Sequence, residues 1–213
     1  MYSFRWVNSL WFIIVCGAFF RVYNLLERGP FKVDGIVYWR VVVKAVQENI
    51  FLWYYAKPGH IFLMWLFTIP FGLKPFVPVL VSLVTGLLTI LTVYFLARRL
   101  YSHEIGLISA AVLAVSPWHV EYSREALSLA NATFFWILFL ILYLKSRPDA
   151  DGDYQPDSLL AQSYDPKRLW IVILSGICLG FAFSCHYNIG LMPLAIFISL
   201  FTLSMKPWTV ESV

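Results

Sequence analysis

Long apolar runs separated by short polar breaks dominate the chain. Residues 6–26 and 78–97 are apolar almost throughout, and each run is long enough for a helix to cross the ~30 Å hydrocarbon layer of a bilayer. One further span starts with residues 106–115, and another ends with residues 135–144. Two more cover residues 169–183 and 191–204. The runs lack the strict alternation of barrel strands. They predict an all-α polytopic membrane protein with about six transmembrane helices, and with residues 1–213 as a single membrane domain.

The composition agrees with lipid as the main solvent. Hydrophobic residues make up 60% of the chain and charged residues 13%, and the mean hydropathy is +0.73. A soluble domain has about twice that share of charge. The net charge of +4 does not indicate a nucleic-acid partner. The odd number of cysteines, Cys16, Cys178 and Cys185, lies in or beside apolar runs without metal-ligand spacing, which favours free buried thiols over a disulfide.

Residues 34–49 have a different pattern. Polar residues recur at helical spacing and form one stripe, which comprises Arg40, Lys44, Gln47 and Glu48, while apolar residues fill the rest. This pattern is typical of a helix that lies in the membrane interface within the first extracytoplasmic loop. Asp34 stands at its head. The carboxylate is either an N-cap of this helix or a group that acts on a lipid-borne substrate, and the two roles are compatible.

The membrane topology depends on residues 61–73. This apolar stretch is short for a span and is interrupted by Pro70. If it does not cross, the basic residues that flank the later spans share one side with Arg5, as the positive-inside rule requires. We therefore expect a re-entrant or interfacial segment. Near the end of the first span, Arg21 needs a partner or snorkels to the headgroups, and we favour snorkelling over a substrate contact.

The hydrophilic segment 146–168 contains five aspartates, and part of it approaches a calcium-binding loop pattern. The positions that require glycine and glutamate hold Tyr154 and Leu160, so the match fails. We expect a flexible cytoplasmic loop. No cluster of His, Asp or Glu has firm ligand spacing elsewhere, so no metal site is predicted, and metal dependence stays open.

On this topology, three polar segments face away from the cytoplasm: the Asp34 stretch, residues 116–128 and residues 185–188. The second of these reads SPWHVEYSR from Ser116 to Arg124. Its guanidinium, Arg124, has a geometry that clamps a phosphate with two hydrogen bonds. The alternatives are an anchor to lipid headgroups or an ion pair with Glu121 or Glu125.

Together these segments resemble the N-terminal half of a GT-C glycosyltransferase of the protein O-mannosyltransferase and aminoarabinose-transferase type, enzymes that use polyprenyl-phosphate-linked sugars. FKVDGIVYW resembles the family's first-loop segment with its acidic pair, and YYAKPGHIFLMW resembles its "KPPL" segment. LTVYFLARRLYSHEIGLISAAVLAVSPWHVEYSREAL resembles its long span, basic turn and "YSR" turn. GICLGFAFSCHYNIGLMPL resembles a later span that contains "KY".

The resemblance assigns roles to three residues. Asp34 matches the first acid of the pair and is expected to act on the acceptor as a base or orienting group. Lys57 and Arg124 match residues expected to bind the donor phosphate. Six further residues are candidates to line the same cavity: His60, His119, Tyr122, Glu125, His186 and Tyr187.

Two departures from the family pattern bear on activity. The second acid of the pair is Gly35, and the acid often found after "YSR" is absent, which leaves Glu125 as the nearest carboxylate. The resemblance also covers only the first half of such an enzyme, so the chain is expected to be a fragment or to have lost activity.

The resemblance implies a membrane enzyme that moves a sugar from a polyprenyl-phosphate donor to an extracytoplasmic acceptor with inversion, without a cofactor beyond the lipid-linked substrate. A prokaryotic plasma membrane is favoured over the endoplasmic reticulum. Expected partners are membrane lipid, the lipid-linked sugar, and other membrane subunits or the missing C-terminal half. The alternative is a non-catalytic subunit that packs in a larger membrane complex. A small transporter is disfavoured because no repeated half is visible.

Overall fold

The computed structural model describes residues 3–25, 33–49, 57–146 and 166–187, and these residues form helices and short turns without a strand. The predicted all-α membrane class is therefore confirmed. The helices are α1 (Ser3–Val22), α2 (Val33–Glu48), α3 (Pro58–Phe71), α4 (Val77–Leu100), α5 (His103–Val115), α6 (Pro117–Arg124), α7 (Ser128–Ser146) and α8 (Pro166–Cys185).

Three of the described helices, α4, α7 and α8, are long and apolar enough to cross a membrane, and α5 with α6 forms a bent fourth candidate. The chain is an integral membrane protein on this evidence. The expected span at 191–204 lies outside the described residues, as do residues 147–165 of the expected cytoplasmic loop. The number of six spans therefore stays a prediction.

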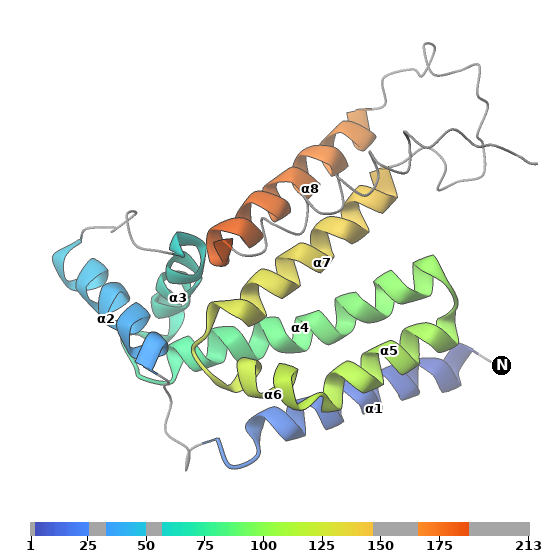
Figure 1. Ribbon diagram of the computed structural model, residues 1–213, viewed down its shortest axis with the longest axis horizontal. Coiled ribbons are helices and arrows are strands. Elements are labelled where there is room, and N and C mark those ends of the chain that lie inside the picture. The colour runs from blue at the N-terminus through green and yellow to red at the C-terminus, as the bar shows by residue number, and fades with distance from the viewer. Residues whose placement is uncertain (1–2, 26–32, 50–56, 147–165, 188–213) are drawn as a thin grey trace, which may run out of the picture.

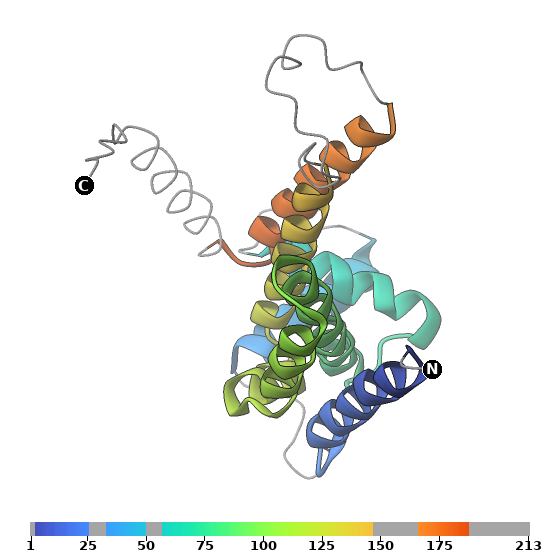
Figure 2. The ribbon, with the colours of Figure 1, turned by 90° about the vertical axis from the view of Figure 1, so that its right-hand side faces the viewer.

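The long helices run between two ends of the molecule (Figure 1). One end holds α2, α3 and α6 together with the last turns of α1 and α8 and the first turns of α4 and α7. The other end holds the α4–α5 turn, the end of α7 and the start of α8. Figure 2 shows α4 and α5 between α1 and the α7–α8 pair, in agreement with the contacts of α1 with α5 and of α4 with α7.

The span that contains α5 breaks at Pro117. Proline has no amide hydrogen and fits the first turn of a helix, so α6 restarts there at an angle of 59° to α5. The break leaves the Ala114 carbonyl at the end of α5 without its usual partner within the helix. Nη1 of Arg21 donates to this oxygen at 3.0 Å, and the Arg21 side chain is fully buried. The prediction that Arg21 snorkels to the headgroups is therefore wrong.

Helix α3 is too short to cross the bilayer. Its 14 residues span about 21 Å at 1.5 Å per residue, against a hydrocarbon layer of ~30 Å. It lies wholly at the end of the molecule that carries α2 and α6 (Figure 1). This placement fits the expected re-entrant or interfacial segment at residues 61–73.

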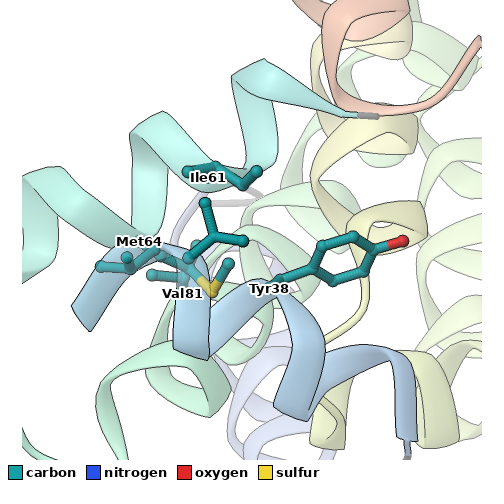
Figure 3. Packing of buried hydrophobic residues seen from close by; sticks show 6 residues of the cluster. Tyr38, Ile61, Met64 and Val81 are labelled. Carbon is teal, nitrogen blue, oxygen red and sulfur yellow. The ribbon is translucent and has the colours of Figure 1, made fainter. Parts of the chain in front are cut away.

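A small apolar core joins the short helices to the spans. Tyr38, Val41 and Val42 of α2 pack with Ile61 and Met64 of α3 and with Val81 of α4, and all six are buried (Figure 3). Burial of each such side chain stabilises the fold by about 1.5–3 kcal/mol. This core fixes α2 and α3 against the first turns of α4.

Helix α2 has three faces rather than two. One face packs on the core, and the predicted polar stripe is exposed, with Lys44 and Glu48 3.8 Å apart. A third face leaves Ile36 and Val46 exposed. Exposed apolar side chains beside a charged stripe suit a helix whose outer surface meets both headgroups and acyl chains.

Candidate functional site

Lys57 stands between α2 and α3 in an unusual backbone conformation. Its φ of 82° and ψ of 53° lie in the left-handed region, which costs a residue with a Cβ about 1–2 kcal/mol. Pro58 follows and starts α3. The ammonium nitrogen lies 5.0 Å from the centroid of the Tyr38 ring, within the range of a cation–π contact. Strained residues that neighbours hold in place are concentrated at functional sites.

Tyr38 connects Lys57 to the next histidine. Its ring meets the His60 ring edge-on, with centroids 5.3 Å apart and an interplanar angle of 89°. The tyrosine is 8% exposed. Its hydroxyl group points away from Ile61, Met64 and Val81 (Figure 3). The phenol therefore belongs to the packed core through its ring and extends a polar group out of that core.

Asp34 lies one helical turn before Tyr38 on the same face of α2. The helix begins at Val33, so Asp34 is inside the first turn rather than at the N-cap position. A carboxylate there is stabilised by the positive end of the helix dipole. The side chain is exposed. Asp34 thus lies one turn before Tyr38 on α2, and the Lys57 ammonium lies over the Tyr38 ring, at one end of the molecule.

The segment that follows Arg124 at the end of α6 packs against His60 and α4. The Ala126 carbonyl, two residues after Arg124, accepts a hydrogen bond from Nε2 of His60 at 3.3 Å. The Ser82 hydroxyl donates to the Leu127 carbonyl at 3.2 Å, which fixes the same segment on α4. Arg124 itself donates to the carbonyl oxygen of Tyr23 at the end of α1. The structure therefore places Asp34, Lys57 and Arg124 at the same end of the bundle.

His186 and Tyr187 follow α8 and also lie at this end. Their rings stack with centroids 5.4 Å apart, and Tyr187 is exposed. The end of α8 packs tightly against the start of α3: a Cβ built on Gly59 would lie 2.2 Å from Oγ of Ser184. A side chain at residue 59 would force Ser184 to shift and would crowd the backbone nitrogen of Cys185, 3.1 Å away.

The charge of Lys57 acts on both nearby imidazoles. Burial, with the Lys57 ammonium as a smaller cause, lowers the pKa of His60 to about 3. Burial, with the Lys57 charge as the second cause, also lowers the pKa of His186. Both rings are therefore neutral at pH 7, and Lys57 carries the positive charge of this group. Such a group can attract an anion and offer it hydrogen-bond donors.

Two of the candidate lining residues on α6 have other neighbours. Nδ1 of His119 lies 2.6 Å from Nη2 of Arg21 on α1. The Tyr122 ring stacks with the ring of Trp118, which is 74% exposed. Glu125 is half-buried and begins the segment that contacts His60. A lining role for these three residues stays a prediction.

Sequence reasoning missed Tyr38, Asn131 and Thr85. Asn131 is fully buried and bonds to His60, and Thr85 bonds to Asn131. The position of Tyr38 four residues after Asp34 was a signal that could have identified it. A single asparagine at the head of an apolar run gives no comparable signal, because its partners come from distant helices.

The fold and these groups define an integral membrane protein with cationic and carboxylate side chains at one end. Residues 56–154 match the dolichyl-phosphate-mannose-protein mannosyltransferase family. The matched stretch includes Lys57, His60 and Arg124, while Asp34 and His186 lie outside it. No curated protein and no solved structure matches the chain. The family match agrees with the resemblance to GT-C membrane glycosyltransferases, over this stretch.

Proposed function

We propose that the chain acts in a membrane glycosyltransferase, which moves a sugar from a polyprenyl-phosphate donor to an acceptor on the extracytoplasmic side. The observation that carries the proposal is the Lys57 ammonium over the ring of Tyr38, which lies one helical turn after Asp34 on α2. A base and a phosphate-binding cation are the two groups that such a transfer needs. The match of residues 56–154 to a mannosyltransferase family supports this substrate class.

The proposed reaction is a single displacement with inversion. The acceptor oxygen or nitrogen attacks the anomeric carbon, and the Asp34 carboxylate takes the acceptor proton. The bond between that carbon and the phosphate oxygen breaks, and the polyprenyl phosphate leaves with the electron pair. The Lys57 ammonium and the Arg124 guanidinium stabilise the negative charge of the leaving phosphate.

Charge at the opposite end of the molecule supports an extracytoplasmic active side. Basic residues flank the ends of the spans there: Arg98, Arg99, Lys145, Lys167 and Arg168 (Figure 1). Cytoplasmic turns carry an excess of such residues. The end with Asp34 and Lys57 then faces away from the cytoplasm. A prokaryotic plasma membrane is our proposal for its location.

A transfer assay on the full chain in vesicles tests the proposal. Loss of polyprenyl-phosphate-linked sugar and release of polyprenyl phosphate are measured for wild type, Asp34→Asn and Glu48→Gln. Glu48 is the matched control because it is an exposed carboxylate at the other end of α2. We expect Asp34→Asn to slow transfer by about a hundredfold or more and Glu48→Gln to leave it unchanged. Equal rates in the two variants would remove Asp34 from the mechanism.

A second candidate function is that of a non-catalytic subunit, and the buried Gly35 favours it. In the GT-C resemblance this position carries the second acid, and a buried glycine there leaves one carboxylate. A subunit of this kind would copurify in a stable membrane complex, and the complex would keep its activity when Asp34, Lys57 and Arg124 are replaced. Loss of activity on any of these replacements contradicts it.

A further inference from the structure

A chain of buried polar groups runs from the segment after α6 to α4. Nε2 of His60 lies 3.3 Å from the Ala126 carbonyl oxygen, and Nδ1 of His60 lies 2.7 Å from Nδ2 of Asn131. The Asn131 amide oxygen accepts a hydrogen bond of 2.6 Å from the hydroxyl group of Thr85. His60 and Asn131 are fully buried and Thr85 is 7% exposed.

The hydrogen bonds permit one consistent arrangement of protons. The Ala126 carbonyl can only accept, so Nε2 of His60 carries the proton and Nδ1 accepts from the Asn131 amide. The amide oxygen of Asn131 then receives the hydroxyl hydrogen of Thr85. This order fits the neutral state of His60. A buried hydrogen-bonded network of this kind favours a single geometry for the helices that it joins.

The network is attached to α3 at the turn that carries Lys57. His60 lies three residues after Lys57 in the sequence Lys57-Pro58-Gly59-His60. Gly59 allows the end of α8 to approach this turn closely, and Pro58 fixes its backbone. A left-handed lysine relaxes unless its surroundings hold it. The network, the proline and the close contact at Gly59 hold the backbone on its C-terminal side.

We propose that His60 and Asn131 are positioning residues that hold the Lys57 ammonium over Tyr38, where it meets the departing phosphate. The role of the phosphate rests on the proposed function, whereas the position of the ammonium does not. An apolar pair at these two sites would pack α3 without the desolvation of four polar groups. The hydrogen-bonded pair adds orientation, which a leaving-group cation requires because a small misplacement reduces the rate strongly.

Chemical labelling of lysines tests the position of the ammonium directly. The purified full chain in detergent is treated with an amine-modifying reagent, and the labelling rates of Lys57 and Lys44 are followed by peptide mass spectrometry. Lys44 is exposed on α2 and serves as the internal reference. We expect His60→Leu and Asn131→Leu to raise the Lys57 rate relative to Lys44 by about fivefold, since each loses two hydrogen bonds of the network.

Thr85→Val and Thr89→Val form a matched pair for the same measurement. Both threonines are buried on α4 and both can bond to a carbonyl oxygen of their own helix, but only Thr85 reaches Asn131. We expect a smaller rise in Lys57 labelling for Thr85→Val and none for Thr89→Val. Because these substitutions keep the side-chain volume, they test the proposal even if His60→Leu does not fold. Equal Lys57 labelling in wild type and Thr85→Val, with folded protein, would overturn it.

Donor kinetics separate positioning from simple loss of stability. We expect folded His60→Leu to raise the KM for the lipid-linked donor and to lower kcat, with the acceptor KM unchanged, and His60→Gln to recover part of both. A uniform loss of active protein, with KM and kcat per folded molecule unchanged, contradicts the proposal. Failure of the wild type to consume donor would remove the proposed function, while the labelling result would still decide the position of Lys57.

Discussion

Nη2 of Arg21 lies 2.6 Å from Nδ1 of His119, so the last turn of α1 is hydrogen-bonded to the helix that follows the break in the fourth candidate span. Nη1 of the same guanidinium bonds to the carbonyl oxygens of Gly17 and Ala114. A guanidinium can only donate, so Nδ1 of His119 accepts and the imidazole is neutral. The cation thus caps the negative end of α5, where the helix dipole stabilises it.

Replacement of Arg21 by methionine should destabilise the protein. The change leaves the Ala114 carbonyl and the His119 nitrogen buried without their donor, and we expect a loss of about 2–4 kcal/mol. Arg21→Lys should lose less stability, because lysine keeps the positive charge and can still donate to one of the two acceptors. The apparent Tm of the purified chain in detergent measures the effect. The control is Arg40→Met on the exposed stripe of α2. A methionine variant as stable as wild type would mean that burial of the charge costs as much as the cap contributes.

Lys57→Gly and Lys57→Ala should differ in stability but not in activity. Both substitutions remove the ammonium from Tyr38, so both should weaken binding of the donor phosphate equally. Glycine adopts the left-handed conformation at no steric cost, and alanine does not. We therefore expect the glycine variant to be more stable than the alanine variant by about 1 kcal/mol. Thermal unfolding of both variants under one condition checks this. The same stability in both would show that the backbone at residue 57 is unstrained.

The low pKa of His60 predicts that stability falls in acid. Burial lowers this pKa to about 3, below the ordinary value of 6.5. Between these values the unfolded chain binds a proton that the folded chain does not, so the stability present above pH 6.5 is lost as the pH falls. The slope from this group is at most about 1.4 kcal/mol per pH unit. The apparent Tm should therefore decrease as the pH is lowered from 6.5 to 4.5, in a series of measurements that starts at pH 8.

His60→Gln is the control for that measurement. Glutamine can donate and accept at this site without titrating, so its profile should be flatter than the wild-type profile. His186 keeps its own contribution in both proteins, and its sign is the same because its pKa is also lowered. Parallel profiles for wild type and His60→Gln would assign the acid sensitivity to other groups.

The sequence predicted the elements that depend on local pattern. Apolar runs predicted the helical class, and the short stretch at 61–73 predicted a helix shorter than a full span, which α3 is. The exposed polar stripe on α2 also follows from periodicity alone. The break between α5 and α6 has a similarly local cause, because Pro117 fits the first turn of α6.

Contacts between distant segments could not be predicted in the same way. Arg21 was expected to reach headgroups, because a local pattern contains nothing about a carbonyl oxygen 93 residues away. Nothing in the local sequence of Asn131 and Thr85 marks them, because the hydrogen bonds that link them to His60 join residues of different helices. The family resemblance identified Lys57 and Arg124 as candidates. The Tyr38 contact of Lys57 and the link from Ala126 to His60 join separate helices, so no local pattern indicates them.

Gly86→Ala should be strongly unfavourable, although alanine is normally preferred in helices. A Cβ at Gly86 would lie 2.2 Å from Oγ and 2.6 Å from Cβ of Ser123, which is fully buried. Ser123 cannot rotate away without losing its 2.6 Å hydrogen bond to the His119 carbonyl. Because α6 must then move off α4, we expect a loss of about 1–3 kcal/mol.

The matched control is Gly176→Ala on α8, where a Cβ meets nothing within 4 Å. That substitution should be neutral or should stabilise the protein by up to about 1 kcal/mol through helix propensity. Ser123→Gly combined with Gly86→Ala should recover part of the loss, because it removes both atoms of the clash. The apparent Tm of wild type, Gly86→Ala, Ser123→Gly and the double variant gives the coupling between residues 86 and 123. If Gly86→Ala is as stable as Gly176→Ala, α6 does not pack on α4 as closely as described.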